Sequence, residues 1–282
     1  MLTTQNLTVN TLTPTIQDQI FADLDRIAMR FPALTLNEIQ EYALQDRVDT
    51  KYLMRLSDLP ELLKELTTDH SILEVAGQRI SNYRTLYFDT PAFNFYHDHH
   101  NGKRPRFKIR MREYISNNQA FLEIKKKENS YRTTKDRIEI ASMQETLSPS
   151  MKGFLMGNYP GEVDSLRPVL WNTFSRMTLV NHNTCERITI DSGLYFFNMT
   201  HSLELSHLAV VELKQDSFSR DAVVVHSLKG KGYQPISFSK FCTGVAILNP
   251  TIKRNQFKKN FLQFKATTKR TYDHVNFTPV HA

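Results

Sequence analysis

Basic side chains recur at every second residue in three short stretches of the sequence, RFKIRMR (106–112), FLEIKKK (121–127) and TKDRIE (134–139). In a β-strand, residues i and i+2 point to the same face of the sheet. One face of each predicted strand therefore carries Lys and Arg with a few carboxylates, and the other carries apolar residues such as Ile109, Met111 and Ile124. Arg binds phosphate bidentately and Lys adds a point charge, so the polar face is typical of a surface that holds a polyanion.

The positive charge of the chain is concentrated in this part of the sequence. Between Lys103 and Arg137, twelve residues are Lys or Arg and four are Asp or Glu, so this segment carries +8, whereas the whole 282-residue chain carries +7. Basicity spread over a whole chain indicates general affinity for nucleic acid or membranes, but basicity on adjacent strands indicates a site. The alternative is a solvated sheet face with lysines that protect an edge, which does not require four cations in one strand.

Other predicted strands repeat the alternation with fewer charges. In these strands charged or polar residues again occupy every second position, except that Arg176 is the single charged residue of its strand. The charged residues are Asp49, Lys51, Arg176, Arg187, Asp191, Glu212 and Lys214. If the strands close into a barrel, the polar faces meet inside it, where unpaired cations are costly unless water, carboxylates or anions accompany them. Phosphates suit this interior. Glu123 and Glu212 would repel a bare polyphosphate, so they either bind a divalent cation that bridges phosphates or pair with neighbouring cations.

Many strands and few helices predict an α+β fold dominated by an antiparallel barrel, with helices packed outside. Asn101-Gly102 is typical of a hairpin turn between strands at about 83–89 and 105–114. A polar approach to this turn explains His97, His99 and His100 better than metal binding does. Ser237 or Ser239 is expected to cap a helix that ends at Asn249-Pro250.

The ends of the chain are expected to form separate segments: an N-terminal helical extension (1–45) before the barrel domain (46–250), and a basic C-terminal tail (251–282). Phe257, Phe261 and Phe264 fit either packing back onto the barrel or an amphipathic helix for an acidic membrane or a partner. There is no run of about 18 apolar residues and no secretory signal, and the two cysteines are far apart, so a cytoplasmic location is expected.

Nine segments resemble, in order, the polyphosphate-polymerase domain of the vacuolar transporter chaperone (VTC) family, a branch of the CYTH-like triphosphate tunnel metalloenzymes. They are RVDTKYLM, YRTLYFDT, RFKIRMREY, FLEIKKK, TTKDRI, FSRMTL, RITID, VVELKQ and SFSKFCTG. The resemblance implies an eight-stranded antiparallel tunnel barrel over residues 46–250. It also implies a transferase that moves the γ-phosphate of ATP onto a growing polyphosphate chain, with Mn²⁺ or Mg²⁺ as cofactor.

The resemblance also implies roles for individual residues. The catalytic set would be Arg110, Arg112, Lys125 and Lys135, the substrate-binding set Lys51, Arg176, Arg187 and Lys240, and the metal ligands Glu212 and Glu123. Ser237 departs from the family pattern, because eukaryotic members have a lysine three residues before the position of Lys240. No membrane segments follow the domain, so coupling of synthesis to translocation would require a membrane-protein partner, through which the protein would be membrane-associated.

Two alternatives stay open at this point. The first is a hydrolase that cleaves triphosphate or short polyphosphate in the same tunnel, with water in place of a phosphate end as the attacking group. The second is a non-enzymatic module that binds polyphosphate or RNA. RNA binding needs stacking aromatic residues beside the basic strands, and the sequence supplies few of them, so no specific nucleic acid is expected.

Overall fold

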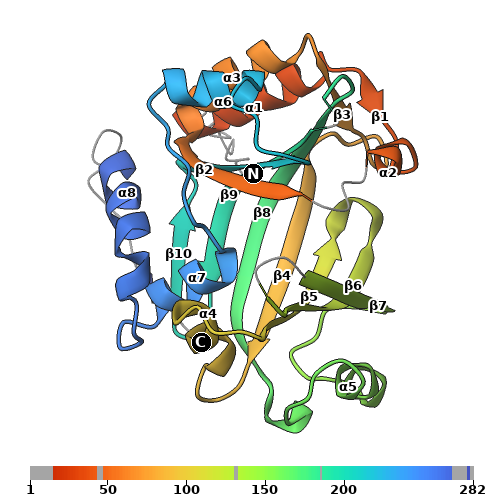
Figure 1. Cartoon of the computed structure of the whole chain (residues 1–282), viewed down its shortest axis with the longest axis vertical. Coiled ribbons are helices and arrows are strands. Elements are labelled where there is room, and N and C mark those ends of the chain that lie inside the picture. Colours follow the sequence, from red (N-terminus) through yellow and green to blue (C-terminus); the bar gives the residue numbers. More distant parts are fainter. Residues whose placement is uncertain (1–14, 43–46, 130–132, 185, 269–277, 280–282) are drawn as a thin grey trace, which may run out of the picture.

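The computed structural model describes residues 15–42, 47–129, 133–184, 186–268 and 278–279. Its main feature is a path of eight antiparallel strands in the order β2-β11-β9-β8-β4-β5-β6-β7 (Figure 1). Their bounds are β2 Val48–Arg55, β4 Ser81–Asp89, β5 Arg106–Tyr114, β6 Gln119–Lys127, β7 Thr133–Ile140, β8 Arg167–Asn181, β9 Arg187–Phe197 and β11 Leu208–Gln215. The fold is β-dominated, antiparallel and barrel-like, as the sequence predicts.

The barrel is not closed by hydrogen bonds between its two end strands. β2 and β7 end the path, and their described residues form no ladder with each other. Residues 235–239, which we call the linking segment, run beside the free edge of β2 instead. The Ile236 amide donates to the Lys51 carbonyl at 2.8 Å, and Tyr52 and Pro235 form an isolated antiparallel bridge.

Shorter strands extend the sheet beyond the barrel path. β1 (Ala33–Leu34) pairs in parallel with β3 (His70–Leu73), which pairs with β8. β10 (His201–Leu205) pairs with β9, and β12 (Thr278–Pro279) pairs with β10.

Helices cover two parts of the outer face of this sheet. α1 (Ile16–Ala28), α3 (Leu59–Leu66) and α6 (Val223–Gly230) bury the apolar residues of β2, β9 and β11, such as Ile190 and Val211 (Figure 1). A second apolar cluster contains Met151 and Leu155 of α5 (Pro149–Met156) together with Ile109 and Met111 of β5, which have no exposed surface. Complete burial of an aliphatic side chain stabilises a fold by about 1.5–3 kcal/mol. The apolar face that the alternation predicts is therefore confirmed as core.

One helix departs from the prediction that helices lie outside. α7 (Lys240–Leu248) packs on the concave face, where Phe241 contacts Tyr87 with ring centroids 5.2 Å apart. Gly244 permits this close approach, because a Cβ there would lie 2.6 Å from the Leu170 side chain. The predicted cap is confirmed: the Ser239 hydroxyl accepts from the Cys242 amide at 3.4 Å, and the helix ends just before Asn249-Pro250.

The connection between β4 and β5 differs from the expected hairpin turn. It contains α4 (Asn94–His100), whose amides at Phe95 and Tyr96 donate to the buried carboxylate of Asp89 at 2.9 and 3.0 Å. Gly102, with a φ of 69°, follows the end of this helix, where glycine is favoured because it adopts the left-handed conformation without strain. The Asn-Gly pair therefore forms a turn that ends a helix rather than a two-residue hairpin, and the expectation of a hairpin turn there is wrong.

The two ends of the described chain pack against the body of the protein. Leu24 and Ile27 of α1 belong to the same apolar cluster as α3 and the strands beneath it. α8 (Lys258–Thr268) is preceded by Phe257, and both Phe261 and Phe264 contact the main core, whereas Leu262 is 57% exposed. α2 (Glu38–Glu41) is a single turn. None of the described helices is long and apolar enough to span a membrane.

Candidate functional site

Three carboxylates on the concave face of the sheet each lie between two basic side chains, and two of them are buried. The first is Glu123 of β6, which is directly opposite Arg110 of β5. Its Oε2 lies 2.6 Å from Arg110 Nη2, and its Oε1 lies 2.5 Å from Lys135 Nζ. Burial alone would raise the pKa of Glu123, but Arg110, Arg112 and Lys135 lower it to about 2. The carboxylate is therefore ionised. Its single negative charge is opposed by the two positive charges of Arg110 and Lys135, so the three side chains together carry a net positive charge.

The second carboxylate, Asp191 of β9, joins the sheet to α7. Arg176 lies opposite it on β8 and forms two hydrogen bonds, from Nε to Oδ1 at 2.5 Å and from Nη2 to Oδ2 at 2.8 Å. Lys240 Nζ, at the start of α7, also donates to Oδ2. Burial opposes ionisation of Asp191, but Arg176 and Lys240 outweigh it and hold the pKa of Asp191 well below its ordinary value.

The third carboxylate, Glu212 of β11, contacts its two cations more loosely. Its oxygens lie 3.4 Å from Lys214 Nζ and 3.6 Å from Lys51 Nζ. Burial would raise the pKa of Glu212, but Lys214 and Lys51 lower it to about 2. Because these contacts are longer than those of Glu123 and Asp191, Glu212 has the most freedom to exchange an ammonium partner for another cation.

Arg112 lies among these groups but is held by aromatic rings. Its guanidinium carbon is 5.5 Å from the centre of the Tyr83 ring and 5.6 Å from that of Phe174, and its Nε donates to Thr85 at 3.3 Å. No carboxylate in the described part of the chain forms a salt bridge with Arg112. Cation–π contacts fix the position of a guanidinium without occupying its hydrogen-bond donors. Arg112 is thus placed to donate to an anion.

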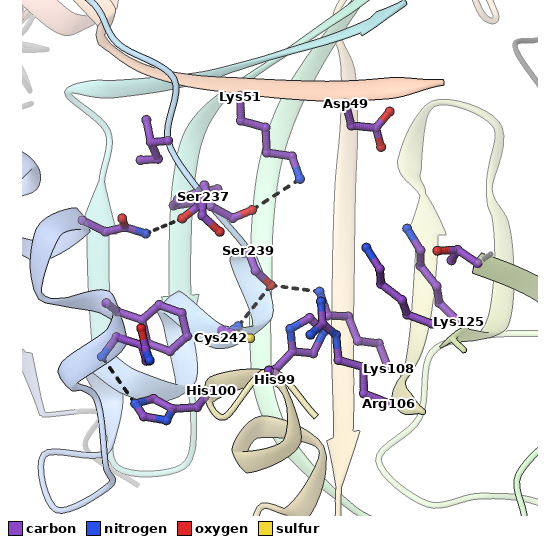
Figure 2. Close-up of a pocket in the computed structure, with 18 of the residues that line it drawn as sticks. Asp49, Lys51, His99, His100, Arg106, Lys108, Lys125, Ser237, Ser239 and Cys242 are labelled. Carbon is purple, nitrogen blue, oxygen red and sulfur yellow. Dashed lines mark hydrogen bonds between the residues drawn. The ribbon is translucent and has the colours of Figure 1, made fainter. Parts of the chain in front are cut away.

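A row of three lysines crosses β5, β6 and β7 without a carboxylate between its members. Lys108 is directly opposite Lys125, and Lys125 is directly opposite Lys135. Like charges directly opposite each other destabilise a sheet, so this row indicates a place where an anion is expected. Lys135 also pairs with Glu123, whereas Lys108 Nζ donates to the Ser239 hydroxyl at 3.1 Å (Figure 2).

This row lines a cavity of about 1180 Å³ between the two end strands of the barrel path. Asp49 and Lys51 of β2 lie above Lys125 in the view of Figure 2, and Ser237 of the linking segment lies on the side away from Lys125. The basic residues in its wall are Arg47, Lys51, Arg106, Lys108, Lys125, Lys127, Lys135 and Lys259, and the carboxylate is Asp49. The cavity therefore has a strongly positive lining.

Arg187 is the one predicted site residue that lies apart from these groups. It shares the polar face of β9 with Asp191, but its Nη2 donates to the Ile39 carbonyl at 2.7 Å and the Tyr42 carbonyl at 3.4 Å. Its guanidinium is thereby engaged with the end of α2. Binding of phosphate by Arg187 stays a prediction.

The structure also adds residues that sequence reasoning did not assign to the site. Asp191 and Lys214 complete two of the three carboxylate groups, and Tyr83 and Phe174 position Arg112. The alternation in RITID and VVELKQ contains the signal for Asp191 and Lys214, but their partners come from other strands. Among the residues described, which include the histidines of α4, no group of three or more His, Cys, Asp or Glu suitable for a metal ion occurs.

The fold and the site together define a barrel-like antiparallel sheet with a cation-lined interior. The family model described as the VTC domain matches residues 46–249 of this sequence. The chain therefore belongs to the VTC domain family.

Solved structures with a similar fold are more distant. A candidate adenylate cyclase from Bacillus halodurans is 15% identical, with a TM-score of 0.46 and coverage of 69% of this chain and 94% of that one. A candidate adenylyl cyclase from Hippeastrum, described as having a dominant triphosphatase activity, is 15% identical, with a TM-score of 0.48 and coverage of 74% and 98%. A candidate adenylate cyclase from Vibrio parahaemolyticus is 13% identical, with a TM-score of 0.41 and coverage of 70% and 96%. No curated protein sequence matches this chain.

Proposed function

We propose that this protein is a metal-dependent polyphosphate polymerase that transfers the γ-phosphate of ATP to the end of a growing polyphosphate chain. The observation that carries this proposal is the excess of cations over carboxylates on the concave face. Three carboxylates each hold two cations, and a lysine row and Arg112 add further positive charge. A chain of phosphates supplies the dense negative charge that this surface lacks.

The protein's own side chains provide binding and charge stabilisation in this proposal. Arg110, Arg112 and Arg176 would hold nonbridging phosphate oxygens, and Lys125 and Lys135 would neutralise the charge that develops on the transferred group. A terminal oxygen of the chain attacks the γ-phosphorus, the bond from that phosphorus to the β–γ bridging oxygen breaks, and ADP leaves. Phosphoryl transfer of this kind relies on positioning and electrostatic stabilisation rather than on covalent catalysis by the protein.

The state of the carboxylates favours a phosphate end over water as the attacking group. The pKa values of Glu123 and Glu212 are lowered to about 2 by their basic neighbours, and that of Asp191 is also lowered. A general base works best when its pKa lies near the operating pH, so these carboxylates are poor bases for the activation of water. A phosphate end is already anionic and needs no base. This contrast supports a transferase rather than a hydrolase.

The residues present fit a divalent cation that arrives together with phosphates. Hard divalent cations such as Mg²⁺ bind through one or two carboxylates together with phosphate oxygens and water. Glu212 would hold Mn²⁺ or Mg²⁺ in this way, because it is ionised and its lysine contacts are long. When bound, the metal would act as a Lewis acid on the phosphate oxygens. Glu123 is a weaker candidate ligand, because both of its oxygens already contact cations at 2.5–2.6 Å.

One experiment tests the proposal directly. Purified protein is incubated with ATP and Mn²⁺ or Mg²⁺, and the products are separated as polyphosphate and orthophosphate. Polyphosphate and ADP are the expected products. Orthophosphate as the main product would support the hydrolase alternative, and no turnover together with tight binding would support a non-enzymatic module. The cytoplasmic location and the membrane-protein partner stay predictions.

A further inference from the structure

We propose that the protein docks on the surface of an anionic lipid bilayer through an exposed face formed by α8 and the segments beside its start. We call it the docking face, and its residues, all exposed to solvent, are Arg104, Lys253, Arg254, Lys258, Lys259 and Leu262. The contact is peripheral, with the lipid headgroups and the outermost part of the acyl chains. Such docking is independent of the reaction proposed above.

The residues of the docking face come from two distant parts of the chain that hydrogen bonds hold together. The Tyr96 hydroxyl of α4 donates to the Lys253 carbonyl at 2.7 Å, and Lys253 Nζ donates to Asn101 Oδ1 at 3.4 Å. Arg104 follows Asn101 by three residues, so its backbone lies within about 11 Å of that of Asn101. Arg104 therefore belongs to the same surface as Lys253 and Arg254.

The packing of α8 fixes which side of this helix faces solvent. Asn260 and Phe264 are buried against the body of the protein, whereas Lys258, Lys259 and Leu262 are exposed. Leu262 follows the two lysines by four and three residues, which is the spacing of neighbours on one helix face. Its side chain is 57% exposed. Lysine ammonium groups reach lipid headgroups while an apolar neighbour inserts between them, so this face is typical of a helix that lies on a membrane.

The positive charge of the docking face is not neutralised from within the protein. In the part of the chain that the structure describes, no carboxylate forms a salt bridge with its five basic residues. Residues 253–270 of the sequence contain seven Lys or Arg and no Asp or Glu, and residues 103–137 carry +8. Because the whole chain carries +7, all other residues together carry −8. The charge of this protein is therefore strongly divided between segments.

Helices far from the docking face contribute to the negative part. α1 contains three aspartates and one arginine, and α2 contains two glutamates. Both helices lie toward the upper end of the view in Figure 1, whereas α4 lies toward the lower end and α8 runs along the left side. An anionic bilayer attracts the docking face and repels the acidic helices, so the charge distribution orients the protein as well as binding it.

A nucleic acid would also be attracted by these cations, but the uncharged part of the docking face favours a bilayer. Binding of single-stranded nucleic acid relies on exposed aromatic rings on which bases stack. The aromatic residues of α8, Phe261 and Phe264, instead contact the main core. An exposed leucine gains little beside phosphate groups alone, whereas at a lipid headgroup layer it buries apolar surface.

The test measures sedimentation of the protein with vesicles of phosphatidylcholine, with and without phosphatidylserine. The docking-face variant removes three basic residues, Lys253→Gln, Arg254→Gln and Lys258→Gln. Lys259 is kept because it also lines the cavity. The control variant removes the same charge from exposed positions on α3, on α6 and just after α1: Arg30→Gln, Lys64→Gln and Lys229→Gln. A third variant, Leu262→Ser, changes no charge, and melting curves show that each variant is folded.

We expect the wild-type and control proteins to bind only the vesicles that contain phosphatidylserine, and to bind less as salt rises because exposed charges are screened. A basic residue near an anionic leaflet strengthens binding about fivefold, so the docking-face variant should bind about a hundredfold more weakly. Leu262→Ser should weaken vesicle binding by about fivefold to tenfold, because less apolar surface is buried. Its affinity for a single-stranded RNA should equal that of the wild type.

Three results would overturn the docking face. The first is no binding of the wild-type protein to anionic vesicles at low salt. The second is an equal loss of vesicle binding in the control variant, which would show that net charge rather than this face decides. The third is vesicle binding unchanged by Leu262→Ser together with tight binding of RNA, which would assign the face to nucleic acid.

Discussion

In the absence of ligand, the carboxylates on the concave face supply the negative charge that a bound anion would otherwise supply to the cations there. Substitution of Asp191 tests this interpretation most directly. Its carboxylate is only 2% exposed and holds both Arg176 and Lys240. Asp191→Asn keeps the shape of the side chain but removes the charge, so two cations are left without a counter-charge beside Arg112. Breaking a buried ion pair by removal of one partner costs about 3–5 kcal/mol.

This loss corresponds to a large change in melting temperature. One kcal/mol shifts Tm by about 2–4 °C in chains of 150–250 residues, and the lower value suits a longer chain. We therefore expect ligand-free Asp191→Asn to melt about 6–10 °C below the wild-type protein, from 3–5 kcal/mol at about 2 °C each. Triphosphate supplies the missing negative charge, so it should raise the Tm of the variant by more than that of the wild type.

The control for this prediction is Asp164→Asn. Asp164 lies 2.6 Å from Lys152, but the two side chains are 62% and 39% exposed, and such surface pairs contribute less than about 1 kcal/mol. Melting curves of the three proteins with and without triphosphate make the comparison. The reasoning is refuted if the Asp191 variant melts like the Asp164 variant, or if triphosphate stabilises it no more than the wild type.

Three further predictions concern the metal, the guanidinium groups and pH. Glu212→Gln should abolish metal-dependent turnover and Mn²⁺ binding in the presence of triphosphate, while metal-free triphosphate binding is kept or strengthened because a negative charge is lost; unchanged turnover at saturating ATP would exclude the metal role. Arg112→Ala should reduce turnover by about tenfold to a hundredfold, as for one lost charge-assisted contact, whereas Lys103→Ala should alter only the salt dependence; equal effects would indicate a diffuse basic surface. Burial lowers the pKa of Lys108 and of Lys240 from 10.5 to about 8, so between about pH 8 and 10.5 the folded protein has lost protons that the unfolded chain keeps. The free energy of unfolding of the ligand-free protein should therefore rise with pH over this window, while the affinity for triphosphate falls. Denaturation and binding are measured across the window, and stability and affinity that change in the same direction would contradict the lowered pKa values of the two lysines.

Much of the barrel could be predicted because strand alternation depends on local chemistry. In β5 and β6 the sequence separates Ile109, Met111 and Leu122 from Arg110 and Glu123 with a period of two, and burial follows that pattern. The same alternation places the cations of the site on one face without any knowledge of the partner strands. Short sequence motifs likewise indicate the family and the barrel-like fold. The capping residue Ser239 indicates where α7 begins.

The pairing of charges could not be predicted, because it depends on register and on contacts between distant segments. Asp191 meets Arg176 only because β8 and β9 pair in one particular register, and it meets Lys240 only because α7 packs on the concave face. α4 was missed for a similar reason. Its first turn is stabilised by the buried carboxylate of Asp89, whereas the local Asn-Gly signal indicates a hairpin.

The linking segment gives the barrel wall an unusual dependence on the ligand. It stands where a ladder between β2 and β7 would close a continuous barrel, and few hydrogen bonds hold it. Two of them come from ammonium groups that face the cavity: Lys51 Nζ donates to the Phe238 carbonyl at 3.3 Å, and Lys108 Nζ donates to the Ser239 hydroxyl at 3.1 Å. A phosphate chain that recruits these lysines competes with the wall for the same donors.

Local opening of a protein is governed by the few contacts that hold each segment, so this part of the wall should loosen as the cavity fills. Amide exchange in residues 236–239 would then accelerate on ligand binding, while exchange in the neighbouring strands slows. A continuous ladder would give a rigid pore that a polymer enters only by its end. If polyphosphate is the ligand, a segment fastened by the ligand's own binding groups would let a long chain enter and leave sideways, so that the time needed for exchange would not grow with chain length.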